Sequence, residues 1–496
     1  MSERLHSLSG LPATVQAPTY DRQAARGIVH LGVGAFHKAH QAVYTDAAMD
    51  DYGGDWMITG VSLRSADVAD ALNPQQGLYT LMVRGADGVS PRIIGSIRKV
   101  LVAPREPQAV LDALAAPETK IVSLTITEKG YGLEPKTGGL DRAHASIAPD
   151  LTDPHSPKGA VGHIVEGLRL RREKGLQPYT VLCCDNLPHN GAVLRRLVTE
   201  FARAVDPDLA TWIEAEVTFP STMVDRITPA STEETLAEAE RLVGASDLAA
   251  VETEPFTQWV VEDNFVQGRP RWEGGGAIFA TDVAPYEKMK LRMLNGAHSM
   301  LAYSGYIAGH RYVRDVMGDA ALAKLVARQM SAAAATLDPV PGVDLERYAA
   351  DLLERFANPA IAHQTYQIAM DGTQKLPQRL LDPAIATLRS GRPLDAYAFA
   401  AAAWMRYCLG MDENGETYAL RDPREAEIAA LLADSGRDAG SIVDRLLGLP
   451  GLFPAELSEA PEWRAGVQRR LEAMLADGMR AAIEREAAGM ATARKA

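Results

Sequence analysis

Four polar residues that lie close together in the sequence are of types that carry out proton-transfer chemistry. They are Glu287, Lys290, Asn295 and His298. If residues 288–308 form an α-helix, side chains turn by about 100° per residue, which puts the other three within roughly 60° to 140° of Lys290. One broad face of the helix can therefore present all four residues to the same space.

These residue types suit the oxidation of an alcohol, in which a base takes the hydroxyl proton while hydride leaves the carbon. Burial beside a cationic cofactor disfavours a charged amine, so Lys290 could be the base. Asn295 could donate to the developing alkoxide, His298 could hold the same oxygen, and Glu287 could relay the proton to solvent. A solvated face of an amphipathic helix is the alternative. Gly296 weakens that alternative, because a glycine inside a helix costs about 1 kcal/mol relative to alanine.

A glycine turn near the N-terminus is typical of a dinucleotide site. Residues 27–34 read as a buried strand that ends in two glycines, whose backbone can approach a pyrophosphate. The residues that would form this site are Gly32, Val33, Gly34, Ala35, Phe36 and His37. His37 stands where the full fingerprint has its third glycine, so a tight strand-to-helix turn without a ligand is the alternative.

Two further strand ends carry polar residues that suit the same site. Asp67, after the second expected strand, could bind ribose hydroxyls and favour NAD, whereas Arg64 could favour NADP. Asn186 follows the fourth expected strand and could be a second oxyanion donor, because ligands bind at the carboxyl ends of parallel strands. An Asx turn with a loop at Asn190–Gly191 is the alternative for that segment.

The elements that must position these residues divide the chain in two. The expected strands are 27–34, 55–62, 120–127 and 179–184, with helices between them that include 107–115 and 159–174. Apolar strands that alternate with helices predict a parallel sheet covered on both faces, and so a doubly wound, Rossmann-type α/β domain at 1–285. Beyond it strand patterns fade. Helical periodicity, as at 320–337 and 461–488, predicts a mostly α-helical domain at 286–496.

Charge and composition exclude some classes of partner. A net charge of −13 argues against a nucleic-acid binder, which needs a basic face to offset phosphate charge. The three cysteines form no metal-binding pattern, and no apolar stretch of the sequence is long enough to span a bilayer. We expect a metal-free, cytoplasmic protein whose partner is a small molecule.

Six stretches of the chain together resemble the long-chain polyol dehydrogenase family, to which the mannitol dehydrogenases belong. They lie at 32–41, 123–131, 184–186, 219–227 and 254–259, and in the pattern Lys290-x4-Asn295-x2-His298. They follow the order expected for the family over nearly the whole chain. The resemblance implies a Rossmann-type domain followed by a helical domain, NAD(H) as the cofactor, no metal, and a chain that can act as a monomer.

The resemblance also implies roles for individual residues. It implies that Lys290 is the general base and that Glu287 relays its proton. Asn186, Asn295 and His298 correspond to the residues that polarise or hold the reacting oxygen. The other implied contacts are Asp225, on a substrate hydroxyl, and Thr125, Glu128 and again Asn186, on the cofactor.

Part of the C-terminal half bears on the substrate. Gln367 stands where mannitol enzymes of the family carry an arginine, and the run 374–383 is more similar to members that interconvert D-mannonate and D-fructuronate. The segment 186–191 is more similar to the mannitol enzymes. A carboxylate substrate needs a cation, which Lys375 or Arg379 could supply. We expect a C6 sugar acid; the alternatives are D-mannitol and D-fructose or a related polyol, and a catalytically silent nucleotide-binding protein.

Overall fold

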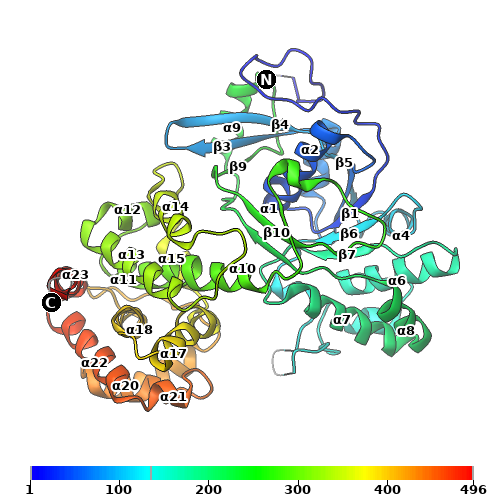
Figure 1. Ribbon diagram of the computed structural model, residues 1–496. Helices are drawn as coiled ribbons and strands as arrows, with labels where there is room; N and C mark the ends of the chain where they lie inside the picture. Colours follow the sequence, from blue (N-terminus) through cyan, green and yellow to red (C-terminus); the bar gives the residue numbers. More distant parts are fainter. Residues whose placement is uncertain (1–2, 135–136, 494–496) are drawn as a thin grey trace. The chain divides into compact units, whose positions relative to one another are not determined.

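The computed structural model describes residues 3–134 and 137–493 (Figure 1). The chain forms two compact units, Met1–Ala284 and Pro285–Ala496. The first unit is built on a parallel sheet, and the second is mostly helical.

A five-stranded parallel sheet forms the centre of the first unit. Across the sheet the strands are β5 (Ile97–Val102), β2 (Ile58–Ser62), β1 (Ile28–Leu31), β6 (Ile121–Leu124) and β7 (Thr180–Cys183). Every neighbouring pair is parallel. The strand order reverses between β1 and β6, as in a doubly wound dinucleotide-binding sheet. The Rossmann-type α/β fold predicted from the sequence is confirmed.

Helices cover both faces of this sheet, because successive side chains of a strand point in opposite directions. In β1, Val29 and Leu31 enter one hydrophobic core, while Ile28 enters the other. The first core includes side chains of α4 (Pro107–Leu114), α6 (Ala160–Glu173), α7 (Asn190–Val205) and α8 (Pro207–Glu216) (Figure 1). The second includes side chains of α1 (Ala35–Ala39), α2 (Gln41–Tyr52) and α3 (Asp67–Leu72). Burial on two faces explains why strands such as β1, β6 and β7 are mostly apolar.

Two small sheets that the sequence patterns do not predict extend the first unit. One contains β4 (Gly88–Ile94), β3 (Tyr79–Gly85) and β9 (Val251–Thr253), in that order. The other contains β11 (Ile278–Ala280), β10 (Gln258–Glu262) and β8 (Thr222–Asp225). The remaining elements are α5 (Ala148–Thr152), α9 (Glu233–Val243), and the 3-10 turns η1 (Asn73–Gln75), η2 (Glu128–Gly130) and η3 (Trp272–Gly275).

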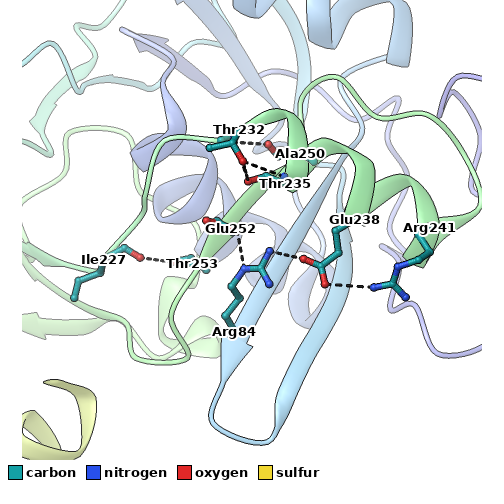
Figure 2. A network of polar contacts seen from close by, with 10 residues as sticks. Arg84, Ile227, Thr232, Thr235, Glu238, Arg241, Ala250, Glu252 and Thr253 are labelled. Atoms are coloured by element: carbon teal, nitrogen blue, oxygen red, sulfur yellow. Dashed lines mark hydrogen bonds and ion pairs between the residues drawn. The ribbon is translucent and has the colours of Figure 1, made fainter. Parts of the chain in front are cut away.

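A polar network fixes α9 to the sheet of β3 and β9 (Figure 2). Arg84 Nε on β3 lies 2.6 Å from a carboxylate oxygen of Glu252 on β9, and a terminal nitrogen of Arg84 lies 2.6 Å from Glu238 on α9. Thr253, the next residue of β9, donates its hydroxyl to the carbonyl of Ile227 at 2.8 Å. The network therefore anchors the chain just after β8 ends.

The second unit consists mainly of helices. They are α10 (Ala284–Met289), η4 (Lys290–Asn295), α11 (Gly296–Ile307), α12 (Val313–Gly318), α13 (Ala320–Ala334), α14 (Leu345–Ala357), α15 (Thr365–Ala369), α16 (Gly372–Leu376), η5 (Pro377–Leu381), α17 (Asp382–Arg389), α18 (Asp395–Tyr407), α19 (Glu425–Leu432), α20 (Ala439–Leu447), α21 (Ala455–Ser458), α22 (Pro461–Ala476) and α23 (Met479–Ala493). Both η4 and η5 are π-helical.

Two expectations for this unit are wrong. Residues 461–488 do not form one helix, because Gly478 has a φ of 84° that an α-helix does not allow, and it separates α22 from α23. Residues 288–308 do not form one α-helix either, because η4 separates α10 from α11. The segment η4 changes the directions in which the polar side chains of residues 287–298 point.

Helices α11 and α18 form the centre of the second unit. They pack against each other, and almost every residue of both is buried. The small alanine side chains of α18 let the two helices pack closely. In the part of the chain that the structure describes, no helix is long and apolar enough to cross a membrane.

Candidate active site

The glycine turn after β1 lies where the strand order reverses. Gly32 has a φ of 92°, and a Cβ atom there would lie 2.3 Å from the carbonyl oxygen of Thr125, so only glycine fits. A Cβ atom at Gly34, by contrast, would meet nothing closer than 3.9 Å. The turn is therefore open at Gly34, as the approach of a pyrophosphate requires.

Buried hydrogen bonds tie this turn to β6. Thr125 donates its hydroxyl to the Gly32 carbonyl at 2.8 Å, and the Thr125 hydroxyl oxygen lies 2.8 Å from His30 Nε2. The Nδ1 atom of His30 lies 2.8 Å from the hydroxyl of Ser123. Burial lowers the pKa of His30 to about 3, so the ring is neutral. His37 is fully buried and stacks on His30 at 3.4 Å between ring centroids, so its ring supports the turn.

Asp185 clamps the loop after β6 to the loop after β7. Its carboxylate accepts hydrogen bonds from the backbone N–H of Ile126 at 2.8 Å, from that of Thr127 at 3.3 Å, and from the Tyr131 hydroxyl at 2.6 Å. Thr127 has a φ of 65°, a strained conformation for a β-branched residue. Burial raises the pKa of Asp185, and these hydrogen bonds oppose the rise. The clamp holds a strained loop next to the glycine turn.

Asn186 is exposed directly after Asp185, at the carboxyl end of β7. The side chain of Asn190 braces this position. Its nitrogen donates to the carbonyls of Asp185 at 3.1 Å and Thr222 at 3.0 Å, and its oxygen accepts from the Thr222 N–H at 2.9 Å. The alternative of a loop at Asn190–Gly191 does not hold, because α7 begins at Asn190.

The other predicted residues of the first unit lie mostly at strand ends. Asp225 is the last residue of β8 and is buried. Arg64 and Asp67 are exposed after β2, where the ribose of a dinucleotide lies in this fold. Val33 is buried. Glu128 begins η2, and its side chain lies outside the described part of the structure.

Lys290 and Asn295 are the first and last residues of the π-helical segment η4. A π-helix has about 4.4 residues per turn, so the angle between side chains five residues apart falls from about 140° in an α-helix to roughly 50°. The segment therefore presents Lys290 and Asn295 in more similar directions than the expected α-helix would. Lys290 is buried, at 7% exposed, while Glu287 and Asn295 are partly exposed.

His298 is buried near the start of α11. Its ring stacks on Phe356 at 4.3 Å between centroids and meets the ring of His363 edge-on at 5.3 Å. Burial lowers the pKa of His298 well below its usual value, and nearby basic side chains lower it further. The ring is therefore neutral near pH 7. Its Nε2 atom has no hydrogen-bond partner among the residues that the structure describes.

Gly296 lets the start of α11 pack against the second π-helical segment. A Cβ atom at Gly296 would lie 2.7 Å from the carbonyl oxygen of Arg379 on η5, so a larger residue would push the two segments apart. This contact explains a glycine at a position that helix propensity disfavours. The Arg379 guanidinium donates to the hydroxyl of Ser299 at 3.4 Å. Ser299 follows His298 in the chain, so this bond brings the charge of Arg379 close to His298.

Lys375 is held by its own segment. Its ammonium nitrogen donates to the carbonyl of Met370 at 2.6 Å and lies 3.9 Å from the carboxylate of Asp371. Lys375 and Arg379 both have partners within this unit, and both remain candidates for binding an anion.

The sequence patterns did not indicate several residues around these sites. Asp185 adjoins Asn186 and could have been noticed as a carboxylate at a strand end. Phe356 and His363 carried no signal, because neither belongs to a motif and they come close to His298 only in the folded unit. Within the described ranges, no group of three or more His, Cys, Asp or Glu side chains could hold a metal ion.

Both units match family models. Residues 26–274 match the mannitol dehydrogenase Rossmann domain, and residues 282–475 match the mannitol dehydrogenase C-terminal domain. The D-mannonate oxidoreductase of Escherichia coli (strain K12) is 46% identical, over 96% of this chain and 98% of its own.

Two solved structures are similar over nearly the whole chain. The Pseudomonas fluorescens mannitol 2-dehydrogenase, in a ternary complex with NAD and D-mannitol, is 40% identical with a TM-score of 0.85, and the match covers 98% of this chain and 99% of that one. A D-sorbitol dehydrogenase in substrate-free form is 37% identical with a TM-score of 0.89, and the match covers 97% of this chain and 100% of that one.

Fold, site and comparisons together define an NAD-dependent oxidoreductase that acts on a CH–OH group. The chain belongs to the mannitol dehydrogenase family. Its own residues fit the cofactor, because the turn is open at Gly34 and an acidic residue, Asp67, is exposed after β2.

We predict that Asp185→Asn weakens NADH binding by about tenfold, because an amide cannot accept from two backbone N–H groups and the hydroxyl together. The dissociation constant is measured by quenching of tryptophan fluorescence. Asp150→Asn is the matched control, since Asp150 also accepts from two backbone N–H groups, those of Lys158 and Gly159. It should lower the melting temperature without changing NADH affinity. Equal NADH affinity in Asp185→Asn and the wild type would refute the clamp.

We predict that Gly296→Ala lowers kcat by at least about tenfold, because separating η4 from η5 displaces Lys290, and small displacements of reacting groups cost rate steeply. Steady-state alcohol oxidation measures the effect. Gly318→Ala is the control, since a Cβ atom there would meet nothing within 4 Å. Wild-type kcat in Gly296→Ala would show that the contact with Arg379 does not position the site.

Proposed function

We propose that this enzyme transfers hydride between NAD(H) and a secondary alcohol or ketone of a C6 sugar acid, D-mannonate and D-fructuronate. The observation that carries the proposal is the positive charge around His298. Burial lowers the pKa of His298, and the charges of Arg355 and Arg379 lower it further. A carboxylate is the substrate group that such charge attracts. The similarity to D-mannonate oxidoreductase supports the same substrate.

A second candidate is D-mannitol and D-fructose. The 40% identity with a mannitol 2-dehydrogenase favours it. A neutral polyol carries no charged group that the guanidinium groups of Arg379 and Arg355 could attract. A catalytically silent nucleotide-binding protein would need none of the lysine, asparagines and histidine that this chain retains.

In the direction of alcohol oxidation, Lys290 acts as the general base. The hydroxyl proton passes to its Nζ atom as the C–H bond of the alcohol carbon breaks and a C=O bond forms at that carbon. Bound NAD+ supplies the hydride acceptor. Glu287, which precedes Lys290 by three residues and is partly exposed, relays the proton to solvent.

Neutral donors stabilise the oxygen as charge develops on it. The His298 ring stays neutral near pH 7, and its Nε2 atom is free of partners among the described residues, so it can bond the reacting oxygen. Asn295 donates its amide N–H group to the same oxygen, and the resemblance to the family implies the same role for Asn186. Asp225, buried at the end of β8, binds a substrate hydroxyl. Because His298 is already neutral, a rise of the rate with pH reports the proton on Lys290.

We predict that the wild-type enzyme, with NADH, has a higher kcat/KM for D-fructuronate than for D-fructose. Arg379→Met should lower kcat/KM for D-fructuronate by at least about 30-fold, since charge-assisted hydrogen bonds to a carboxylate are strong, and change that for D-fructose by less than about threefold. Lys375→Met is the comparison and should affect D-fructuronate less than Arg379→Met does. A wild-type preference for D-fructose would rule out the sugar-acid proposal, and equal losses on both substrates would rule out Arg379.

A further inference from the structure

His363 meets the catalytic histidine of the second unit directly. It lies in the segment before α15, and its ring is edge-on to His298, with an interplanar angle of 87°. The other ring contact of His298, its stack on Phe356, has an interplanar angle of 19°. His298 is thus held by two aromatic rings, of which only His363 carries polar atoms.

Two ring nitrogens in this cluster are buried without a partner. Among the residues that the structure describes, neither His298 Nε2 nor His363 Nδ1 makes a hydrogen bond. Buried polar atoms are nearly always bonded, since leaving them unpaired costs free energy. The two ring centroids are only 5.3 Å apart, so the two nitrogens belong to one cluster. The role assigned to His298 accounts for the first of them and leaves the second unexplained.

The surroundings of His363 favour an anion. Burial lowers its pKa to about 4, with Arg355 and Lys375 contributing, so the ring is neutral near pH 7. A neutral imidazole donates one hydrogen bond and accepts one. The charge of Arg355 lowers the pKa of both His298 and His363. A negatively charged ligand group beside these rings is stabilised by the same charge.

The backbone around His363 is already fixed. Its carbonyl accepts from the N–H of Val313 at 2.9 Å. Two residues on, Thr365 donates its N–H to the Arg311 carbonyl at 3.0 Å and its hydroxyl to the His310 carbonyl at 2.8 Å. A ligand that binds His363 therefore meets a positioned ring and does not have to order a loop.

We infer that His363 determines substrate specificity by donating a hydrogen bond to the carboxylate of the sugar acid, which three carbon atoms separate from the ketone carbon whose oxygen His298 holds. The inference rests on the proposed function and adds a residue to it. His363 accordingly discriminates between an acid and a neutral sugar, while Lys290, Asn295 and His298 act on both.

The test is His363→Phe, which keeps an aromatic ring against His298 and removes both nitrogens. We expect kcat/KM for D-fructuronate to fall at least about tenfold, mainly through KM, with less than about threefold change for D-fructose. His363→Asn, which retains a donor in a smaller side chain, should recover part of the loss and replaces the first variant if the larger ring alters folding. His310→Gln is the control, because His310 pairs with Asp319 at 3.4 Å and should leave both substrates unaffected.

Each other outcome has a distinct meaning. If the wild type prefers D-fructuronate and His363→Phe keeps that preference, the inference fails and the proposed function stands. If both substrates lose kcat equally, His363 only orients His298, and the specificity role is overturned. If the wild type prefers D-fructose, the proposed function itself fails, whatever the variant does.

Discussion

The contact between Gly296 and the carbonyl of Arg379 is the constraint on which the second unit's site depends. It allows two π-helical segments to pack directly, one carrying Lys290 and Asn295, the other carrying Arg379. A π-helical turn is rare because its hydrogen bonds are less favourable, and it persists where packing or function requires it. Here it turns the lysine and the asparagine toward similar directions, and it brings the guanidinium near His298. The residues for proton transfer and the candidate for anion binding therefore depend on one backbone contact.

In the first unit, polar side chains position the loops at the ends of the strands. Asp185 holds the strained backbone at Thr127, and Asn190 ties the end of β7 to β8. Both lie within five residues of Asn186, whose amide is proposed to bond the reacting oxygen. These polar groups are buried or partly buried and fully used in hydrogen bonds, so they position the loop without competing for a ligand.

The parallel sheet was predictable because burial on both faces leaves a direct mark on composition: β1, β6 and β7 are mostly apolar, and their polar residues His30, Ser123 and Thr180 are buried. The glycines of the turn and the polar residues at 287–298 were readable for a similar reason, since their types are unusual for their places. The π-helical turn was not readable, because propensity and periodicity describe one helix at a time and the turn follows from packing on η5. The small sheets escaped notice because β9 and β11 have three residues each, too few to show alternation. The place of His363 beside the site was not predictable, because its contact with His298 joins residues far apart in the chain.

The central claim is that Lys290 removes the proton from the substrate alcohol. It is tested most directly by chemical rescue of Lys290→Ala with small primary amines, measured as alcohol oxidation across a range of pH. We predict that the variant loses at least about 1,000-fold in kcat and no longer shows the rise of rate with pH, and that added amine restores turnover in proportion to its free-base concentration. Turnover in Lys290→Ala close to that of the wild type, with the same pH dependence and no response to amine, would contradict the account.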